Sequence, residues 1–176
     1  MADTRLGPEE WVRAGLKALA KSGASALKAD KLAAGLGVSR GSFYWHFADV
    51  PAFHAAVLKR WREVALENII AEIETTSDPL EALLHRAFAG GSGVESAVRA
   101  WATADAQARK AVEAVDAERI RYLQNLLVDA GIAPEVAAMR ARVMNWTYLG
   151  FAISSPKLEG GSVNRLIREL SNLFRR

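Results

Sequence analysis

Side chains able to contact a nucleic acid are concentrated in the sequence RGSFYWH, which begins at Arg40. Arg40 and Ser42 can donate hydrogen bonds to base edges or phosphates. Tyr44, Trp45 and His46 each combine a flat apolar ring with one hydrogen-bonding group, which suits contact with a sugar-phosphate backbone or a thymine methyl group. The alternative is that these three rings belong to the core or to an ordinary surface. Three of them on one short polar helix would make an unusual core, so we expect a nucleic-acid contact here.

Two short helices joined by a tight turn are predicted around this segment. Leu32, Ala33 and Leu36 fall on one face of the first helix. Gly37 suits the position just past that helix, where a left-handed backbone is favourable only without a side chain. Ser39 is a good N-cap, because its hydroxyl can accept a hydrogen bond from an amide of the second helix. These features predict a helix-turn-helix whose second helix can enter the major groove of DNA.

The second helix also has an apolar side. Phe43 and Phe47 lie four residues apart and therefore on one face. We expect this face to anchor the helix to the core, and Val38 to fill the junction between the two helices. The residues that anchor the helix are thus separate from those that point outward.

The motif resembles the TetR family of transcriptional regulators, whose N-terminal signature is close to IA..aGvs.gtlY.hF. The matching residues, in the same spacing, are Leu32-Ala33, Leu36-Gly37-Val38-Ser39, Gly41-Ser42-Phe43-Tyr44 and His46-Phe47. The resemblance implies DNA contacts at Lys28, Ser39, Arg40, Gly41, Ser42, Tyr44, Trp45 and His46.

Two residues depart from the family pattern. Lys28 stands where the family usually has threonine, so a capping hydroxyl is replaced by a flexible cation that can still meet a phosphate. Val50 stands where a lysine is frequent, so that phosphate contact loses its usual side chain.

Length and charge are compatible with this interpretation but do not establish it. The chain has 176 residues, 51% of them hydrophobic, which allows either one compact domain or a small head with a larger body. The net charge is +3, and residues 1–50 hold seven basic and five acidic side chains, which gives +2. Most of the positive excess therefore lies with the motif, in the direction expected for attraction to phosphates.

Several other classes of protein are disfavoured. The chain has no cysteine, and its three histidines, His46, His54 and His85, form no close metal-ligand pair, so we expect neither a metal site nor a cofactor. Neither a signal peptide nor a membrane span is visible, and we expect a cytoplasmic protein. An enzyme is disfavoured because His54 and His85 have no evident partners in a recognisable motif, and the glycines of 90–93 lack the lysine of a phosphate-binding loop.

The periodicity predicts an all-α fold with a three-helix head over residues 1–50 and a helical ligand-sensing and dimerisation body over residues 51–176. The first helix should begin near Pro8 and end at Gly23. A long helix should follow Asp49 as its N-cap and run toward Glu74. Its expected apolar stripe is Phe53, Val57, Trp61, Val64 and Asn68. Further helices are expected at 79–89, 94–102, 104–130, 134–154 and 162–174, with a glycine joint at 90–93.

The last two predicted helices carry more apolar surface than one chain readily covers. Residues 143–153 are apolar nearly all round, and residues 163–174 form an apolar stripe. We therefore expect a symmetric homodimer with a four-helix interface, as the family resemblance also implies. The alternative is that both helices form the core of a monomer. The expected interface residues are Val143, Trp146, Phe151, Val163, Leu166, Ile167, Leu170, Leu173 and Phe174.

The resemblance further implies that the body binds a small-molecule effector. Aromatic and apolar side chains could line an apolar cavity for a flat hydrophobic ligand, although side chains at this spacing also suit a plain core. The candidates are Trp61, Phe88, Trp101, Tyr122, Met139 and Trp146. Two arginine pairs, Arg119 with Arg121 and Arg140 with Arg142, could bind an anionic ligand or could simply be solvated.

The function expected from these observations is a DNA-binding regulator, by family resemblance a repressor. It would bind a palindromic operator as a homodimer and leave it when the effector binds. The alternative is an architectural or adaptor protein that binds DNA without an effector.

Overall fold

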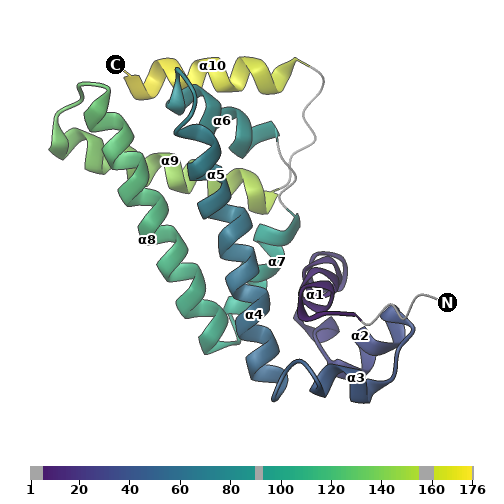
Figure 1. Cartoon of the computed structure of the whole chain (residues 1–176). Coiled ribbons are helices and arrows are strands. Elements are labelled where there is room, and N and C mark those ends of the chain that lie inside the picture. The colour runs from purple at the N-terminus through teal and green to yellow at the C-terminus, as the bar shows by residue number, and fades with distance from the viewer. Residues whose placement is uncertain (1–5, 90–92, 155–160, 176) are drawn as a thin grey trace. The chain divides into compact units, whose positions relative to one another are not determined.

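The computed structural model describes residues 6–89, 93–154 and 161–175, and these contain helices and turns but no strand (Figure 1). The helices are α1 Pro8–Ser22, α2 Ala29–Leu36, α3 Arg40–Tyr44, α4 Val50–Arg62, α5 Asn68–Ile73, α6 Pro79–Ala89, α7 Gly93–Ala102, α8 Ala106–Asp129, α9 Pro134–Ser154 and α10 Ser162–Arg175. A 3-10 turn, Ala24–Ala26, precedes α2, and a π-helical segment, Glu63–Glu67, lies between α4 and α5. The all-α prediction is confirmed. The expected glycine joint at 90–93 falls mostly on residues outside the described ranges.

The chain forms two compact units. The first, called the head unit here, comprises the described residues of Met1–Glu63 together with Gly93–Val112. The second, called the body unit, comprises those of Val64–Ser92 and Glu113–Arg176. The expected domains, 1–50 and 51–176, were divided by function, and their boundary stays a prediction. By contacts, the head unit also includes α7, because α7 packs against α1.

Aromatic rings form the core of the head unit. The ring of Phe43 lies edge-on to that of Trp11, with centroids 5.5 Å apart, and also to that of Phe53, at 5.2 Å. Phe47 packs on Phe53 at 5.0 Å. Phe43 is fully buried and Phe47 is 8% exposed, so the expected apolar anchor of the second motif helix is confirmed.

The ends of the motif helices follow the sequence signals, with one exception. Gly37 has a left-handed backbone, with φ 69° and ψ 28°, and ends α2 as expected. The Asp49 carboxylate accepts a hydrogen bond from the Ala52 amide at 2.7 Å and caps α4. Ser39 is the N-cap of α3, but its side chain accepts no hydrogen bond from the helix. The expected role of the Ser39 hydroxyl as a cap is therefore wrong, which leaves the hydroxyl available for an external contact.

The helix after the motif is interrupted, which corrects its expected apolar stripe. Phe53, Val57 and Trp61 are buried as expected, but Val64 is 41% exposed. The π-helical segment Glu63–Glu67 adds one residue to a turn, so the next buried position after Trp61 is Leu66. From that point the buried face is shifted relative to a regular helix, and Asn68 is exposed.

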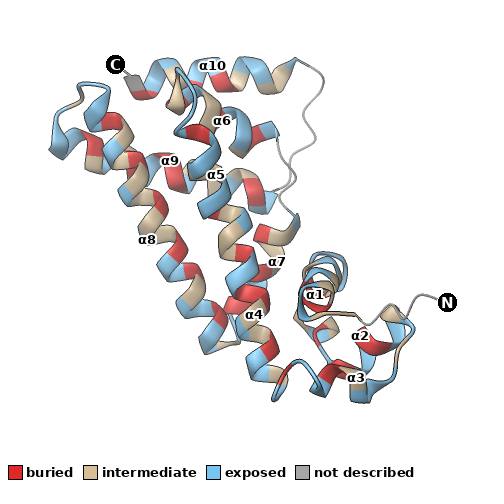
Figure 2. Ribbon diagram, viewed as in Figure 1, coloured by how far each residue is buried: buried red, intermediate tan, exposed pale blue. Residues whose placement is uncertain are grey.

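The core of the body unit is built from the facing sides of α6, α8, α9 and α10. α6 and α10 pack together, and their buried residues include Leu84, Phe88 and Ile167. Leu127 of α8 and Ala141 of α9 are also fully buried in this cluster. Figure 2 shows buried and exposed stretches alternating along α8, as expected for a helix with one covered side.

Candidate nucleic-acid interface

The predicted DNA-contacting residues lie in one short stretch of the head unit, from Lys28, the N-cap of α2, to His46, two residues past the end of α3. Lys28, Ser39, Arg40, Gly41, Tyr44, Trp45 and His46 are exposed, and Ser42 is half-buried. The Trp45 side chain is 87% exposed. An indole so accessible contributes little to the core. DNA contact by these residues stays a prediction.

Arg40 and Tyr44 form a pair on the exposed side of α3. An Nη2 hydrogen of Arg40 is donated to the Tyr44 hydroxyl oxygen over 3.2 Å, and the Arg40 Cζ lies 5.6 Å from the centre of the Tyr44 ring. The hydrogen bond to Tyr44 is the largest cause that raises the pKa of Arg40 above its ordinary value. The guanidinium is therefore charged and held beside the ring, where both groups face outward.

The buried side of α3 explains how so short a helix can present these groups. Arg40–Tyr44 is too short to be stable alone, because helix nucleation is costly. Phe43 fixes α3 to the head core, and its ring also touches that of Tyr44, with centroids 5.2 Å apart. The position of the outward side chains is thus set by the aromatic core beneath them.

Gly41 has no evident role inside the chain. A Cβ built on Gly41 would meet nothing closer than the Ser39 hydroxyl oxygen, at 3.7 Å, which is an ordinary contact. Glycine also destabilises a helix relative to alanine. If the position needs glycine, the requirement comes from something that approaches the backbone from outside.

Two lysines border the motif differently. Lys28 is the N-cap of α2 and makes no side-chain cap hydrogen bond, so its exposed ammonium group can reach outward. Lys31 donates a hydrogen bond from Nζ to the carbonyl oxygen of Ser25 at 3.0 Å. Lys31 therefore braces the turn before α2, a role that sequence reasoning did not assign.

The predicted effector-binding residues fall into different environments. Trp61 and Trp101 are buried in the head unit, and Phe88 is buried in the body core, as the core alternative expects. Met139 and Trp146 are 60% and 61% exposed, so neither lines an enclosed cavity in the single chain. Tyr122 is half-buried with a buried hydroxyl.

The predicted dimer residues divide into core and surface. Ile167, Leu170 and Phe174 are buried in the core of the body unit. These three residues therefore follow the alternative interpretation, in which the helix forms part of the core of a single chain. Phe151, Val163 and Leu166 are half-buried against the same core. The remaining three are exposed, namely Val143, Trp146 and Leu173.

An exposed apolar stripe runs along α9 and extends the predicted interface. Its members recur at alternating three- and four-residue intervals, which is the heptad spacing of packed helix pairs. The stripe, called the α9 seam here, consists of Val136, Met139, Val143, Trp146, Gly150 and Ile153. Val136 and Ile153 were not among the predicted interface residues, although their spacing from Val143 and Trp146 places them on the same stripe.

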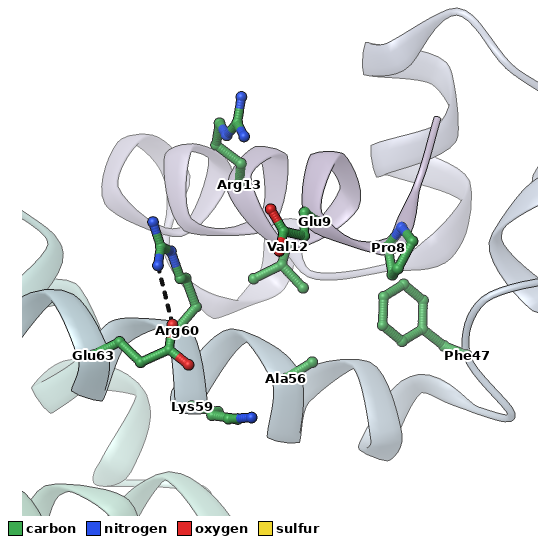
Figure 3. Close-up of a pocket in the computed structure, with 9 residues that line it drawn as sticks. All are labelled: Pro8, Glu9, Val12, Arg13, Phe47, Ala56, Lys59, Arg60 and Glu63. Atoms are coloured by element: carbon green, nitrogen blue, oxygen red, sulfur yellow. Dashed lines mark hydrogen bonds and ion pairs between the residues drawn. The ribbon is translucent and has the colours of Figure 1, made fainter. Parts of the chain in front are cut away.

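A cleft of about 220 Å³ lies between α1 and α4 in the head unit (Figure 3). Val12 and Phe47 contribute apolar walls, and charged groups of both signs stand around them. Arg60 donates to the Glu63 carboxylate at 3.0 Å, so part of that charge is already paired. None of the predicted DNA-contacting residues lines this cleft.

The described parts of the chain show neither a metal-binding cluster nor a membrane-spanning helix. Within residues 6–89, 93–154 and 161–175, no group of three His, Asp or Glu side chains is placed to hold a metal ion. In the same residues, no helix is long and apolar enough to cross a membrane.

The chain is similar to known regulators in sequence over the motif and in fold over nearly its whole length. Residues 12–49 match the family model described as bacterial regulatory proteins, tetR family. No significant match to a curated protein was found.

Three solved structures illustrate the similarity of fold. A Rhodococcus sp. protein assigned to the TetR family of transcriptional regulators has a TM-score of 0.72 at 18% identity, covering 96% of this chain and 98% of that one. A Pseudomonas aeruginosa PAO1 protein assigned as a transcriptional regulator has a TM-score of 0.72 at 16% identity, covering 98% and 93%. The fatty acid degradation regulator FadR of Bacillus halodurans has a TM-score of 0.68 at 13% identity, covering 99% and 96%. The chain therefore carries the helix-turn-helix DNA-binding fold of the TetR family of transcriptional regulators, as its motif predicted.

Proposed function

We propose that this protein is a transcriptional repressor that binds an inverted-repeat operator as a homodimer and leaves it when an effector binds in the body unit. The observation that carries the proposal is the outward surface of α3. There Arg40, Tyr44 and Trp45 are exposed while Phe43 fixes the helix from beneath. A charged guanidinium beside exposed aromatic rings suits hydrogen bonding and stacking against DNA better than any role within the head core.

The two kinds of contact on α3 should have different tasks. Arg40 can donate two hydrogen bonds to a guanine edge or bind a phosphate. Tyr44 and Lys28 suit the sugar-phosphate backbone, which positions the protein without reading sequence. The unused hydroxyl of Ser39 is a further donor for a phosphate at the start of α3.

The α9 seam supports the homodimer. Met139, Trp146 and Ile153 are each about three-fifths exposed, and apolar side chains in such a row favour a covering partner. A second copy of α9 is the natural occupant, because a heptad row packs against its own symmetry mate. A two-fold dimer would present two copies of α3 to half-sites roughly 34 Å apart, or a small multiple of that distance.

Release by an effector requires that the effector bind more tightly to a conformation whose two heads no longer fit both half-sites. A ligand shifts such an equilibrium only by its difference in affinity for the two states. Release by an effector is what the family resemblance implies.

Selection of bound sequences from random duplex DNA with the full-length protein tests the proposal. The expected result is an enriched inverted repeat whose half-sites lie about one helical turn apart. Enrichment of single half-sites would contradict the dimer. Weak, salt-sensitive binding without any enriched motif would contradict the repressor and favour the architectural or adaptor alternative.

A further inference from the structure

A buried arginine joins three segments of the body unit. Arg119 on α8 is 9% exposed, and an Nη2 hydrogen is donated to the carbonyl oxygen of Ala65 at 3.1 Å. Its Nη1 lies 3.7 Å from the Asp116 carboxylate, and its Cζ lies 5.1 Å from the centre of the Tyr148 ring on α9. The Arg119 charge is therefore compensated, and the side chain fixes the spacing of α8 and α9.

Two buried polar atoms, one on α8 and one on α9, have no hydrogen-bond partner among the described residues. One is the Oδ1 of Asn145, a residue that is 3% exposed, and the other is the hydroxyl of Tyr122. Buried polar groups in folded proteins are nearly always hydrogen-bonded, so each such atom calls for an explanation. An unpaired buried acceptor costs stability, which a folded protein tolerates most readily where the group has another task.

Helix geometry places the two atoms on the same side of the Arg119–Tyr148 contact. Tyr122 lies three residues after Arg119 on α8, and Asn145 lies three residues before Tyr148 on α9, so each shares a face with its neighbour. The end of α8 and the start of α9 meet at the turn of residues 130–133. Tyr122 and Asn145 are therefore each about one helical turn nearer to the α8–α9 connection than the Arg119–Tyr148 contact is.

The surroundings favour a neutral occupant. Two carboxylates act on these side chains, because Asp116 lies beside Arg119 and the charge of Glu74 affects Tyr122. The Arg119 guanidinium already interacts with the Asp116 carboxylate and the Ala65 carbonyl oxygen. Burial, followed by the charge of Glu74, raises the pKa of the Tyr122 hydroxyl, so this group is a neutral donor at physiological pH. Ala65 also belongs to the π-helical segment, and such segments occur often at functional sites.

We propose that Asn145 and Tyr122 recognise the polar group of the effector, which is a neutral, mainly apolar molecule carrying adjacent hydrogen-bond donor and acceptor atoms, such as a primary amide. The effector would donate to Asn145 Oδ1 and accept from the Tyr122 hydroxyl. This inference rests on the proposed function, because it specifies the ligand class of the body unit.

Calorimetric titration of the full-length protein with three probes on one flat ring system tests the inference. The probes are 2-naphthamide, which is neutral and has donor and acceptor atoms, methyl 2-naphthoate, which is neutral and only accepts, and 2-naphthoate, which is an anion. The expected affinity for 2-naphthamide is about tenfold or more above that for either other probe, because a site built to pair both groups rejects analogues that lack one.

Two variants and one control separate recognition from structure. Asn145→Leu and Tyr122→Phe should each reduce 2-naphthamide affinity toward that of methyl 2-naphthoate. Val128→Ala, a change at an exposed position of α8, should not. Thermal unfolding of each variant would establish that it is folded, and Tyr122→Phe removes only one oxygen atom.

Four outcomes would overturn the inference. The first three are equal binding of the probes, tighter binding of 2-naphthoate, and no binding of 2-naphthamide. The fourth is an unchanged preference for 2-naphthamide in both variants, which is expected if ordered water pairs with the two atoms. Selection of operator DNA does not depend on any probe. An enriched inverted repeat without 2-naphthamide binding would therefore reject this inference and leave the proposed DNA-binding function standing.

Discussion

Gly41 offers a direct test of whether DNA approaches the α3 backbone. Replacing Gly41 by alanine should raise the free energy of unfolding by up to about 1 kcal/mol, because alanine favours the helix and its Cβ meets no close neighbour. The same methyl group should obstruct a phosphate or base edge. Operator affinity is then expected to fall by about tenfold or more, equal to about 1.4 kcal/mol. Chemical denaturation and fluorescence anisotropy with labelled operator measure the two effects.

Gly35→Ala is the matched control for that experiment. Gly35 is exposed on α2, and a Cβ there would meet nothing within 4 Å. The Gly35→Ala substitution should stabilise the protein as Gly41→Ala does but leave operator affinity unchanged. A Gly41→Ala variant that binds operator as tightly as the unmodified protein would show that α3 does not approach DNA at this position.

Arg40 and Tyr44 should contribute differently to DNA binding. Tyr44→Ala is expected to weaken binding to all sequences, because it removes a backbone contact and the ring that supports Arg40. Arg40→Ala should in addition lower discrimination at one operator position by about 10- to 100-fold. Binding to a panel of operators with single base changes measures both quantities.

The direct contact between the two side chains adds a test of coupling. Because Arg40 donates to the Tyr44 hydroxyl, the double variant should lose less affinity than the two single losses combined. The assignment would be reversed if Tyr44→Ala alone abolished sequence preference while Arg40→Ala had no effect.

At the residue scale, the sequence was most informative where one local interaction decides the structure. Gly37 and Asp49 behave as their types predict, because a left-handed turn and an N-cap depend on adjacent backbone. The Arg40–Tyr44 pair was not predicted, although the four-residue spacing on a helix was a usable signal. The unpaired Oδ1 of Asn145 could not be foreseen, because it depends on which helices surround α9.

Gly15 is where the packing of α1 against α4 is closest. A Cβ on Gly15 would lie 2.7 Å from the Cζ of Phe53 and 3.0 Å from the Cγ2 of Val57, and Phe53 is fully buried among other rings. Gly15→Ala should therefore force the two helices apart and lower the free energy of unfolding by about 1–3 kcal/mol, despite the better helix propensity of alanine. Denaturant unfolding measures the change.

The sign of that change is the informative result. Gly35→Ala again serves as the comparison, since it makes the same chemical substitution without a close neighbour and should be stabilising. Equal stabilisation by both substitutions would mean that α1 and α4 are not in close contact at Gly15.

At the element scale, helix positions could be predicted because apolar periodicity and Gly or Pro breaks are local. The bounds of α6 and α9 match the expected ranges. The π-helical segment could not be predicted, since its residues have ordinary helical types and its shift appears only in which side chains are buried. One extra residue in a turn was enough to move the buried position from Val64 to Leu66.

At the scale of the whole molecule, the sequence does not distinguish an apolar stripe that belongs to the core of one chain from a stripe that forms a dimer interface. An apolar stripe covered by its own chain and one covered by a second chain have the same spacing. Ile167 and Phe174 are of the first kind, whereas Val143 and Trp146 remain exposed. Ile167 and Phe174 are covered because α10 packs on α6, and that placement depends on contacts between distant parts of the body unit.

Trp146→Asp should dissociate the dimer. A carboxylate at the centre of the α9 seam would meet its symmetry mate across the two-fold axis, where a charge without a partner is costly. Within a single chain Trp146 is 61% exposed, so the fold should be little affected. Sedimentation should change from dimer to monomer, and affinity for the inverted repeat should fall by about 100-fold or more because two linked half-site contacts become one. Affinity for a single half-site should be unchanged.

Val128→Asp provides the comparison, because it places the same charge on an exposed apolar position of α8 outside the seam. This variant should remain a dimer and bind the inverted repeat normally. If Trp146→Asp also remained a dimer at micromolar concentration, the α9 seam would not be the interface. If the unmodified protein sedimented as a monomer, α9 would require another partner, and a two-fold operator would lose its structural basis.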